Sequence, residues 1–132
     1  MDKVLIDSSA WIDFFRKREP CHSAILRLME GGTICCSGII LAELLQGAVS
    51  EKEIAVIKDF LYVFEFLPDS LELWERAGKL SYACGKGGHR IGLADCYLSV
   101  MAIANGARLL TLDKHFESLR AHVGLKFFDP GT

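Results

Sequence analysis

The sequence lacks the spacing patterns of several common functional sites. It contains neither a glycine-rich phosphate loop nor a GxGxxG fingerprint, which excludes P-loop nucleotide hydrolases and dinucleotide-dependent dehydrogenases. The four histidines form no i, i+4 pair and have no partnered cysteine, so a zinc site is a poor fit. The chemistry of the chain must therefore come from other residue types.

The cysteines do not follow a disulfide pattern. There are five of them, an odd number, with no CxxC spacing and with Cys35 and Cys36 adjacent. This arrangement fits neither a disulfide framework nor a zinc site. The first four residues also lack the basic-then-apolar layout of a signal peptide. We therefore expect the protein in the reducing cytoplasm.

Long uncharged hydrophobic runs are absent as well. The most apolar long stretch, residues 93–110, contains Asp95, Asn105 and Arg108, which argues against a membrane span. With 132 residues, 51% hydrophobic and 24% charged, the chain has the composition of one globular domain, residues 1–132. The net charge of −2 does not by itself mark a nucleic-acid binder. Basic charge is nevertheless concentrated in three clusters: residues 16–18, Lys86 with 89–90, and residues 114–115.

Apolar runs of strand length alternate with helical patterns along the chain. This order predicts a three-layer α/β/α fold with a central, mostly parallel sheet covered on both faces. Glycines at 85, 87 and 88 predict a flexible loop over residues 85–88. Four aromatic side chains are predicted to lie in the core: Trp11, Phe14, Trp74 and Tyr97. The predicted strands are 3–6, 33–36, 63–67, 108–112 and an edge strand at 125–128, and the predicted helices are 10–18, 22–30, 40–46, 51–61, 70–84, 93–105 and 114–121.

Four acidic residues have the local sequence of a strand end or a helix start: Asp7, Glu43, Asp95 and Asp113. Functional groups of an α/β sheet gather just beyond the carboxyl ends of its strands, and three of the four acids are predicted to lie there. Carboxylates are the ligands that Mg²⁺ and Mn²⁺ prefer. Such ions assist in-line displacement at phosphorus. The joint pattern therefore predicts metal-dependent phosphodiester hydrolysis.

Each acid, taken alone, also has a structural interpretation. Asp7 and Asp113 fit helix N-caps, because each follows a strand and precedes a helix. Glu43 fits a glutamate favoured by the dipole near a helix start. Asp95 lies in an almost wholly apolar segment, where an ionised carboxylate is costly unless a metal ion or an arginine compensates it. The candidate arginines are Arg90 and Arg108.

Four motifs of the sequence resemble those of the PIN-domain ribonucleases, and most of all the VapC-type toxins of bacterial toxin-antitoxin pairs. Each motif carries one acid, and the acids stand 36, 52 and 18 residues apart. The resemblance spans nearly the whole chain and leaves all four acids intact. Ser8 stands where threonine is common in the family, and Ser9 where asparagine or serine is. The motifs are residues 4–12 around Asp7, the Glu43 helix, Asp95 ahead of Ala102-Ile103-Ala104, and residues 109–116 around Asp113.

The resemblance implies a PIN fold whose four acids form a catalytic quartet that binds Mg²⁺ or Mn²⁺, with Asp7 and Asp95 as direct ligands. Ser9 and Thr111 match the family's small hydroxyl positions, which orient acids or waters around the metal. Basic residues close to the site in the chain are predicted to hold the phosphates of RNA. These predicted RNA contacts are Lys86, Arg90, Lys114 and His115.

The expected function is that of a metal-dependent endoribonuclease acting as the toxin of a toxin-antitoxin pair. The family implies a structured RNA substrate, such as transfer or ribosomal RNA, cut in a single-stranded loop. It further implies a VapB-like antitoxin whose basic segment, through an arginine, enters the acidic site. A homodimer is expected, with contributions from Phe60, Leu61 and Trp74. Two alternatives remain open: a housekeeping PIN nuclease without an antitoxin, and a non-catalytic PIN-fold module whose acids bind a partner's basic segment.

Overall fold

The computed structural model describes residues 2–131, and within them a sheet of four parallel strands. The strands lie in the order β3-β2-β1-β4, with β1 at Lys3–Ile6, β2 at Ile34–Cys36, β3 at Glu65–Phe66 and β4 at Ala107–Leu110. In the central pair, Lys3 lies opposite Ala107 and Ile6 opposite Leu110. The predicted parallel sheet is confirmed, although β3 is shorter than expected.

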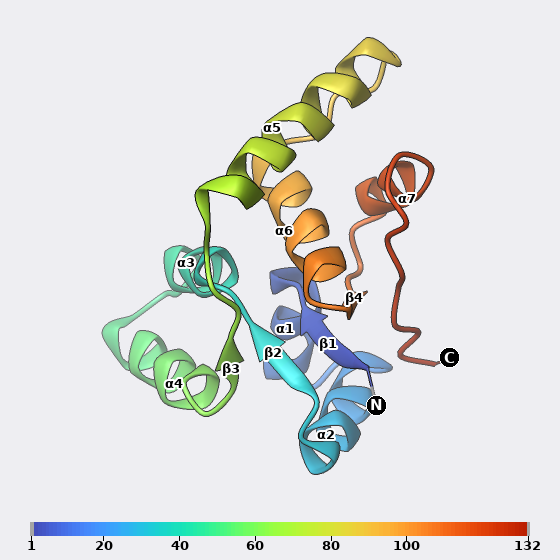
Figure 1. Ribbon diagram of the computed structural model, residues 1–132. Helices are drawn as coiled ribbons and strands as arrows, with labels where there is room; N and C mark the ends of the chain where they lie inside the picture. The colour runs from blue at the N-terminus through green and yellow to red at the C-terminus, as the bar shows by residue number, and fades with distance from the viewer. Residues whose placement is uncertain (1, 132) are drawn as a thin grey trace.

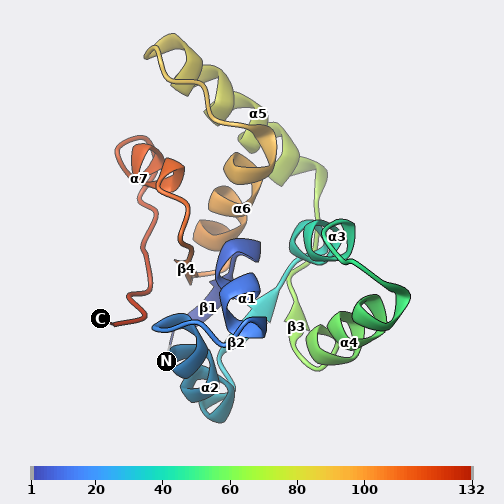
Figure 2. The same cartoon turned by 180° about the vertical axis from the view of Figure 1, so that it is seen from behind.

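Helices cover both faces of this sheet. Helix α6 lies in front of it in Figure 1, and α1 lies in front in the reverse view of Figure 2. The predicted three-layer α/β/α arrangement is therefore confirmed. No helix in the described part of the chain has both the length and the apolar character needed to cross a membrane. The helices are α1 at Ser8–Phe15, α2 at Cys21–Gly31, α3 at Gly38–Gln46, α4 at Glu51–Leu61, α5 at Leu71–Lys86, α6 at Leu93–Ala104 and α7 at His115–Arg120.

The core explains why the strands and α6 are so apolar. Because helices pack on both faces of a parallel sheet, its strands carry nearly continuous hydrophobic runs, and Leu5 and Ile6 of β1 are completely buried. In α6, seven consecutive residues, 96–102, are buried. The five cysteines are also buried and unpaired. Burial raises the pKa of the Cys35 thiol to about 12 and those of Cys36 and Cys96 to about 11.

Two predictions at the ends of elements are wrong. Helix α5 does not end at residue 84 but continues through Gly85 to Lys86, and a Cβ atom at Gly85 would lie 3.2 Å from the guanidinium of Arg90. The helix ends at Lys86, and in the turn that follows Gly88 has a φ of +89°, which glycine adopts at little cost. Residues 125–128 form a single parallel bridge beside Leu109 instead of a strand, because within residues 2–131 only Leu109 makes backbone hydrogen bonds between β4 and this segment, with Lys126 and Phe128.

Two predicted burial assignments are also corrected. Trp74 was expected in the core but its side chain is 41% exposed, since it packs as an outer layer on Tyr97. Leu61 was expected in a homodimer contact but is completely buried, so it has no surface to offer a partner. The other three predicted core aromatics, Trp11, Phe14 and Tyr97, are buried as expected.

One buried hydroxyl ties α6 to the carboxyl end of β3. The Tyr97 hydroxyl donates to Asp69 Oδ1 over 2.7 Å, and the Trp74 ring stacks on Tyr97 with centroids 3.7 Å apart. Asp69 lies in the connection between β3 and α5. Since Asp95 lies only two residues before Tyr97 in α6, this contact helps to fix the position of Asp95.

The Tyr97 contact predicts a measurable loss of stability. Tyr97→Phe keeps the packed ring and removes the hydrogen bond, so we expect the free energy of unfolding to fall by about 1 kcal/mol. Urea unfolding followed by circular dichroism measures this change. Tyr82→Phe, on the exposed side of α5, is the matched control and should change stability by less than about 0.5 kcal/mol. Equal effects of the two substitutions would contradict a stabilising role for the Tyr97 hydroxyl.

Candidate metal centre

Asp7 follows β1 directly and occupies the backbone position that caps α1. Its side chain nevertheless makes no capping hydrogen bond, which contradicts the interpretation of Asp7 as a side-chain cap. Instead, Asp7 Oδ2 accepts hydrogen bonds from Ser9 Oγ over 3.0 Å and from Thr111 Oγ1 over 2.8 Å. The carboxylate is 95% buried and points toward the loop after β4.

The two hydroxyl groups also shape that loop. Ser9 Oγ accepts from the Leu112 N–H over 3.0 Å, and Thr111 Oγ1 accepts from the Asp113 N–H over 3.0 Å. A continuous set of hydrogen bonds therefore runs from the Asp7 carboxylate to the backbone of Asp113. The structure thus places Ser9 and Thr111 where they orient one acid and position the segment that carries another.

Asp95 is the third residue of α6 and is partly buried. Burial is the main cause that raises the pKa of its carboxyl to about 6, followed by repulsion from Asp113 and from Asp7, while His115 acts in the opposite direction. No ion pair joins Asp95 to an arginine among residues 2–131. The alternative of an arginine partner is therefore wrong. The guanidinium of Arg108 pairs with Asp2 over 2.9 Å, and that of Arg90 packs beside Gly85.

Glu43 reaches the same cluster from α3. It is the sixth residue of that helix, beyond the first turn, so attraction to the helix start does not explain it. The Ser8 hydroxyl donates to Glu43 Oε1 over 3.3 Å. Burial raises the pKa of Glu43, and repulsion from Asp7 and Asp95 adds to this. These shared pKa effects show that Glu43 lies close to the other acids.

Asp113 follows β4 and fixes the start of α7. Its Oδ1 accepts from the His115 N–H over 2.9 Å and lies 3.2 Å from His115 Nδ1. The N-cap of α7 is Lys114 and not Asp113, so the interpretation of Asp113 as the helix cap is wrong, although its carboxylate holds the first N–H of the helix. Ligand atoms of Asp95, Asp113 and His115 all lie within 4.8 Å of one another. The sequence interpretation left His115 out of the metal ligands, and the only available signal was its position two residues after Asp113.

The donor set fits a divalent cation. Carboxylates from separate segments of the chain converge, and after burial their repulsion adds to the raised pKa values of Asp95 and Glu43, so a divalent cation would relieve that repulsion. Oxygen donors suit Mg²⁺ and Mn²⁺. The cluster can therefore hold such an ion at the carboxyl edge of the sheet.

The predicted RNA contacts are all exposed. Lys114 and His115 directly follow Asp113 in the chain. Lys86 ends α5, where its ammonium lies 5.7 Å from the centre of the Tyr82 ring, and Arg90 follows in the next loop. The β4–α7 turn therefore brings Lys114 and His115 close to the acids. Neither Lys86 nor Arg90 forms an ion pair with an acid within residues 2–131.

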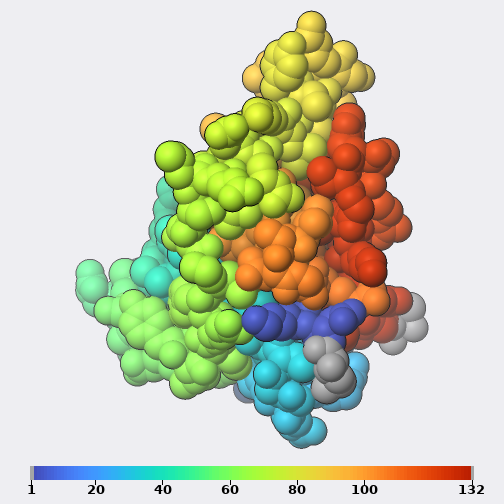
Figure 3. All heavy atoms as spheres, in the orientation of Figure 1, coloured from blue at the N-terminus to red at the C-terminus, as the bar shows by residue number. Residues whose placement is uncertain are grey.

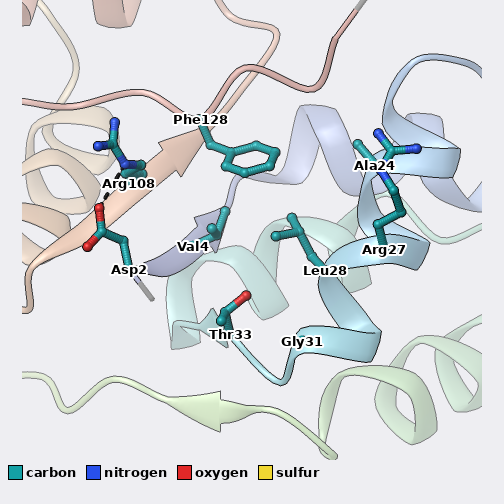
Figure 4. Close-up of a pocket in the computed structure, with 9 residues that line it drawn as sticks. All are labelled: Asp2, Val4, Ala24, Arg27, Leu28, Gly31, Thr33, Arg108 and Phe128. Atoms are coloured by element: carbon teal, nitrogen blue, oxygen red, sulfur yellow. Dashed lines mark hydrogen bonds and ion pairs between the residues drawn. The ribbon is translucent and has the colours of Figure 1, made fainter.

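Two hollows of the surface differ in their relation to the acids. A groove of about 650 Å³ between α1, α3 and α4 has an apolar floor and includes Glu43 in its wall. A second cavity, of about 350 Å³, lies at the amino end of β1, where Arg27, Phe128 and the Asp2–Arg108 ion pair surround an apolar centre (Figure 4). None of the four acids lines this second cavity. The groove, and not the cavity, is therefore continuous with the acidic cluster.

The pKa of Asp95 predicts how stability depends on pH. Because its folded value of about 6 exceeds the ordinary 3.8, the native state holds the proton more tightly than the unfolded chain does. This stabilisation is complete below about pH 4 and is lost as pH rises through about 6. In EDTA near neutral pH, Asp95→Asn should therefore melt at or above the wild-type temperature and lose less stability between pH 4 and 7.

Thermal melts across this pH range measure the effect. Asp59→Asn, an exposed substitution on α4, is the matched control and should follow the wild type. If Asp95→Asn melted several degrees below the wild type near neutral pH in EDTA, Asp95 would be a structural residue and not a strained one.

Known proteins resemble this chain in sequence and in fold. The PIN domain family profile matches residues 4–121. Ribonuclease VapC1 of Methanocaldococcus jannaschii is 34% identical over 128 residues, which cover 96% of this chain and 88% of that protein. Ribonuclease VapC11 of Mycobacterium tuberculosis is 26% identical over 119 residues, covering 86% and 89%.

Solved structures agree with the sequence relatives. The DNA-bound VapBC of Salmonella typhimurium superposes with a TM-score of 0.80 at 21% identity, covering 99% of this chain and all of the matched chain. VapBC-1 of nontypeable Haemophilus influenzae gives a TM-score of 0.77 at 21% identity, with 96% and 97% covered. These likenesses concern the fold. The profile match and the 34% identity show that the chain belongs to the PIN domain family and to its VapC type.

Proposed function

We propose that this chain, acting as a single domain over residues 1–132, is a divalent-metal-dependent endoribonuclease and the toxin of a toxin-antitoxin pair. The observation that best supports the proposal is the convergence of acids from separate segments, where burial first, and then repulsion from Asp113 and Asp7, raise the pKa of Asp95 to about 6. The names of its relatives, ribonucleases of the VapC type, support RNA as the substrate. The five unpaired cysteines suit a reducing cytoplasm.

The four acids would hold Mg²⁺ or Mn²⁺: Asp7, Glu43, Asp95 and Asp113. Such an ion, when bound, stabilises charge on the phosphate and provides hydroxide at neutral pH. Asp7 keeps one orientation because two hydroxyl groups donate to the same carboxylate oxygen. Positive charge in the cluster would lower the pKa of Asp95, since it would favour the ionised carboxylate against the effect of burial and the repulsion of Asp113 and Asp7.

Exposed basic residues beside the acids would hold the RNA backbone. Lys114 and His115 adjoin Asp113, so they can contact phosphates next to the bond that is cut. Lys86 lies at the end of α5, which projects beyond the rest of the molecule in Figures 1 and 3. Lys86 and Arg90 would therefore contact RNA farther from that bond. This spread of contacts suits a structured RNA, such as transfer or ribosomal RNA, that is cut in a loop.

The groove beside Glu43 would receive the antitoxin. Its floor offers apolar side chains, among them Ile12, Phe15 and Val56, and its wall includes Glu43. A segment lying in the groove can therefore place an arginine into the acidic cluster. The arginine guanidinium is always charged and binds carboxylates through two parallel hydrogen bonds. We expect it to neutralise the acids and to exclude RNA from the site.

A homodimer forms part of the same proposal. Exposed apolar side chains occur on α5 and at the start of α6: Leu71 is 86% exposed, Tyr82 64%, Leu93 55% and Trp74 41%. Exposed apolar groups of this size mark interaction surfaces. The contact would therefore include the predicted Trp74.

Removing one ligand charge should stop cleavage. Asp95→Asn keeps the side-chain volume, so we expect normal folding and a loss of Mg²⁺- or Mn²⁺-dependent RNA cleavage of about 100-fold or more. Cleavage of a labelled transfer RNA, with EDTA and with each metal, measures the effect. Asp59→Asn should cleave at the wild-type rate. Full activity of Asp95→Asn, or wild-type cleavage that persists in EDTA, would contradict the proposed site.

A charge placed in the groove should weaken antitoxin binding without affecting cleavage. Val56 is half exposed on α4, so Val56→Glu should fold normally while placing an unpaired charge against an apolar segment. We expect its complex with the protein encoded by the adjoining gene to weaken by about 10-fold or more. Val63→Glu, exposed outside the groove, is the control. Unchanged affinity of Val56→Glu, measured by calorimetry, would exclude the groove as the docking site.

A further inference from the structure

His115 is the one histidine that the fold brings to the acids among the described residues. It is the first residue of α7, and Asp113 holds it twice, because the same Oδ1 accepts from the His115 N–H and lies 3.2 Å from Nδ1. The backbone contact fixes the start of the side chain, and the contact with Nδ1 fixes the ring. The imidazole is therefore held in place before any ligand arrives.

Three different donors meet at this point. Ligand atoms of Asp95, Asp113 and His115 lie within 4.8 Å of one another, a spacing that allows all three to contact one ion. His115 has no role in the core, because its side chain is 68% exposed. Its orientation toward two carboxylates is thus not a by-product of packing.

The chemistry of the third donor affects the choice of metal. Mg²⁺ is a hard ion that takes oxygen ligands and rarely accepts nitrogen, whereas imidazole suits first-row transition ions. Mn²⁺ accepts both carboxylate oxygen and imidazole nitrogen. A site made of acids alone would favour neither ion strongly, whereas a site that includes an imidazole would favour Mn²⁺.

We propose that His115 is a direct ligand of the ion held by Asp95 and Asp113, and that it makes the site select Mn²⁺ over Mg²⁺. This inference rests on the proposed function, since it assigns a ligand and a metal preference to the same site. It changes the role of His115 from an RNA contact to a metal ligand. It also gives the enzyme a metal preference that four carboxylates would not supply.

Two other roles for His115 predict different results. If His115 only contacts RNA, its removal leaves metal affinity unchanged in the absence of RNA. If it only provides positive charge beside Asp113, its removal weakens the binding of neither Mg²⁺ nor Mn²⁺, because such a charge repels a cation when present and has no effect when the imidazole is neutral. A ligand role predicts weaker binding, and predicts it mainly for Mn²⁺.

Calorimetric titration of the metal-free chain with MnCl₂ and with MgCl₂ distinguishes these roles. Measurements at about pH 8 keep the imidazole available, because a histidine ligand must be neutral. We expect His115→Ala to reduce Mn²⁺ affinity by about 10-fold or more and Mg²⁺ affinity by less than about 3-fold. His122→Ala, an exposed histidine just after α7, is the matched control and should bind both metals as the wild type does.

Pulsed electron paramagnetic resonance of the Mn²⁺-loaded wild type provides a test that needs no variant. A nitrogen ligand produces ¹⁴N modulation, which should be present in the wild type and in His122→Ala and absent in His115→Ala. Absence of ¹⁴N modulation in the Mn²⁺-loaded wild type, or unchanged or tighter Mn²⁺ binding by His115→Ala, would overturn the inference and leave the proposed function intact. A wild type that binds neither metal would overturn both.

Discussion

The register of β1 against β4 determines where the functional side chains lie. Ile6 lies opposite Leu110 in this parallel pair, and the Asp7 N–H donates to the Leu110 carbonyl over 2.9 Å. Asp7 and Thr111 are therefore neighbours, although 104 positions separate them in the sequence. Side chains alternate between the two faces of a strand, so a shift of the β1–β4 register by one residue would direct either Asp7 or Thr111 to the opposite side of the sheet. The loop that carries Asp113 depends on the same contact.

Helix α6 combines two opposing requirements. Residues 96–102 are buried against the sheet and α5, and the burial of apolar surface is the main energy that holds this helix in place. Asp95 lies one residue before that buried segment, close to other carboxylates that repel it. The hydrophobic energy of the rest of the helix therefore offsets the electrostatic cost of its first turn. An acid on a loosely held loop would move away from the cluster.

The sequence predicts those features that depend on local pattern. Asp7 and Asp113 were identifiable because each follows an apolar strand, and Asp95 because a carboxylate is unusual in so apolar a segment. The role of His115 was not predictable, since it depends on how sharply the chain turns between β4 and α7. The exposure of Trp74 was missed for a related reason: helical periodicity shows that a residue faces a neighbour, but not whether a second layer covers it. Residues 125–128 were predicted as a strand but form a single bridge, because a short apolar run does not reveal how many backbone hydrogen bonds it makes.

The buried cysteines have a consequence for the behaviour of the protein under oxidising conditions. A thiol reacts with peroxide as its thiolate, and the thiols of Cys35, Cys36 and Cys96 have pKa values of about 11 to 12. Almost no thiolate is therefore present at neutral pH, and burial also denies the oxidant access. The folded chain should resist oxidants that inactivate enzymes with exposed, acidic cysteines. Its thiols become vulnerable only when the core opens, so thiol oxidation would affect misfolded copies and spare native ones.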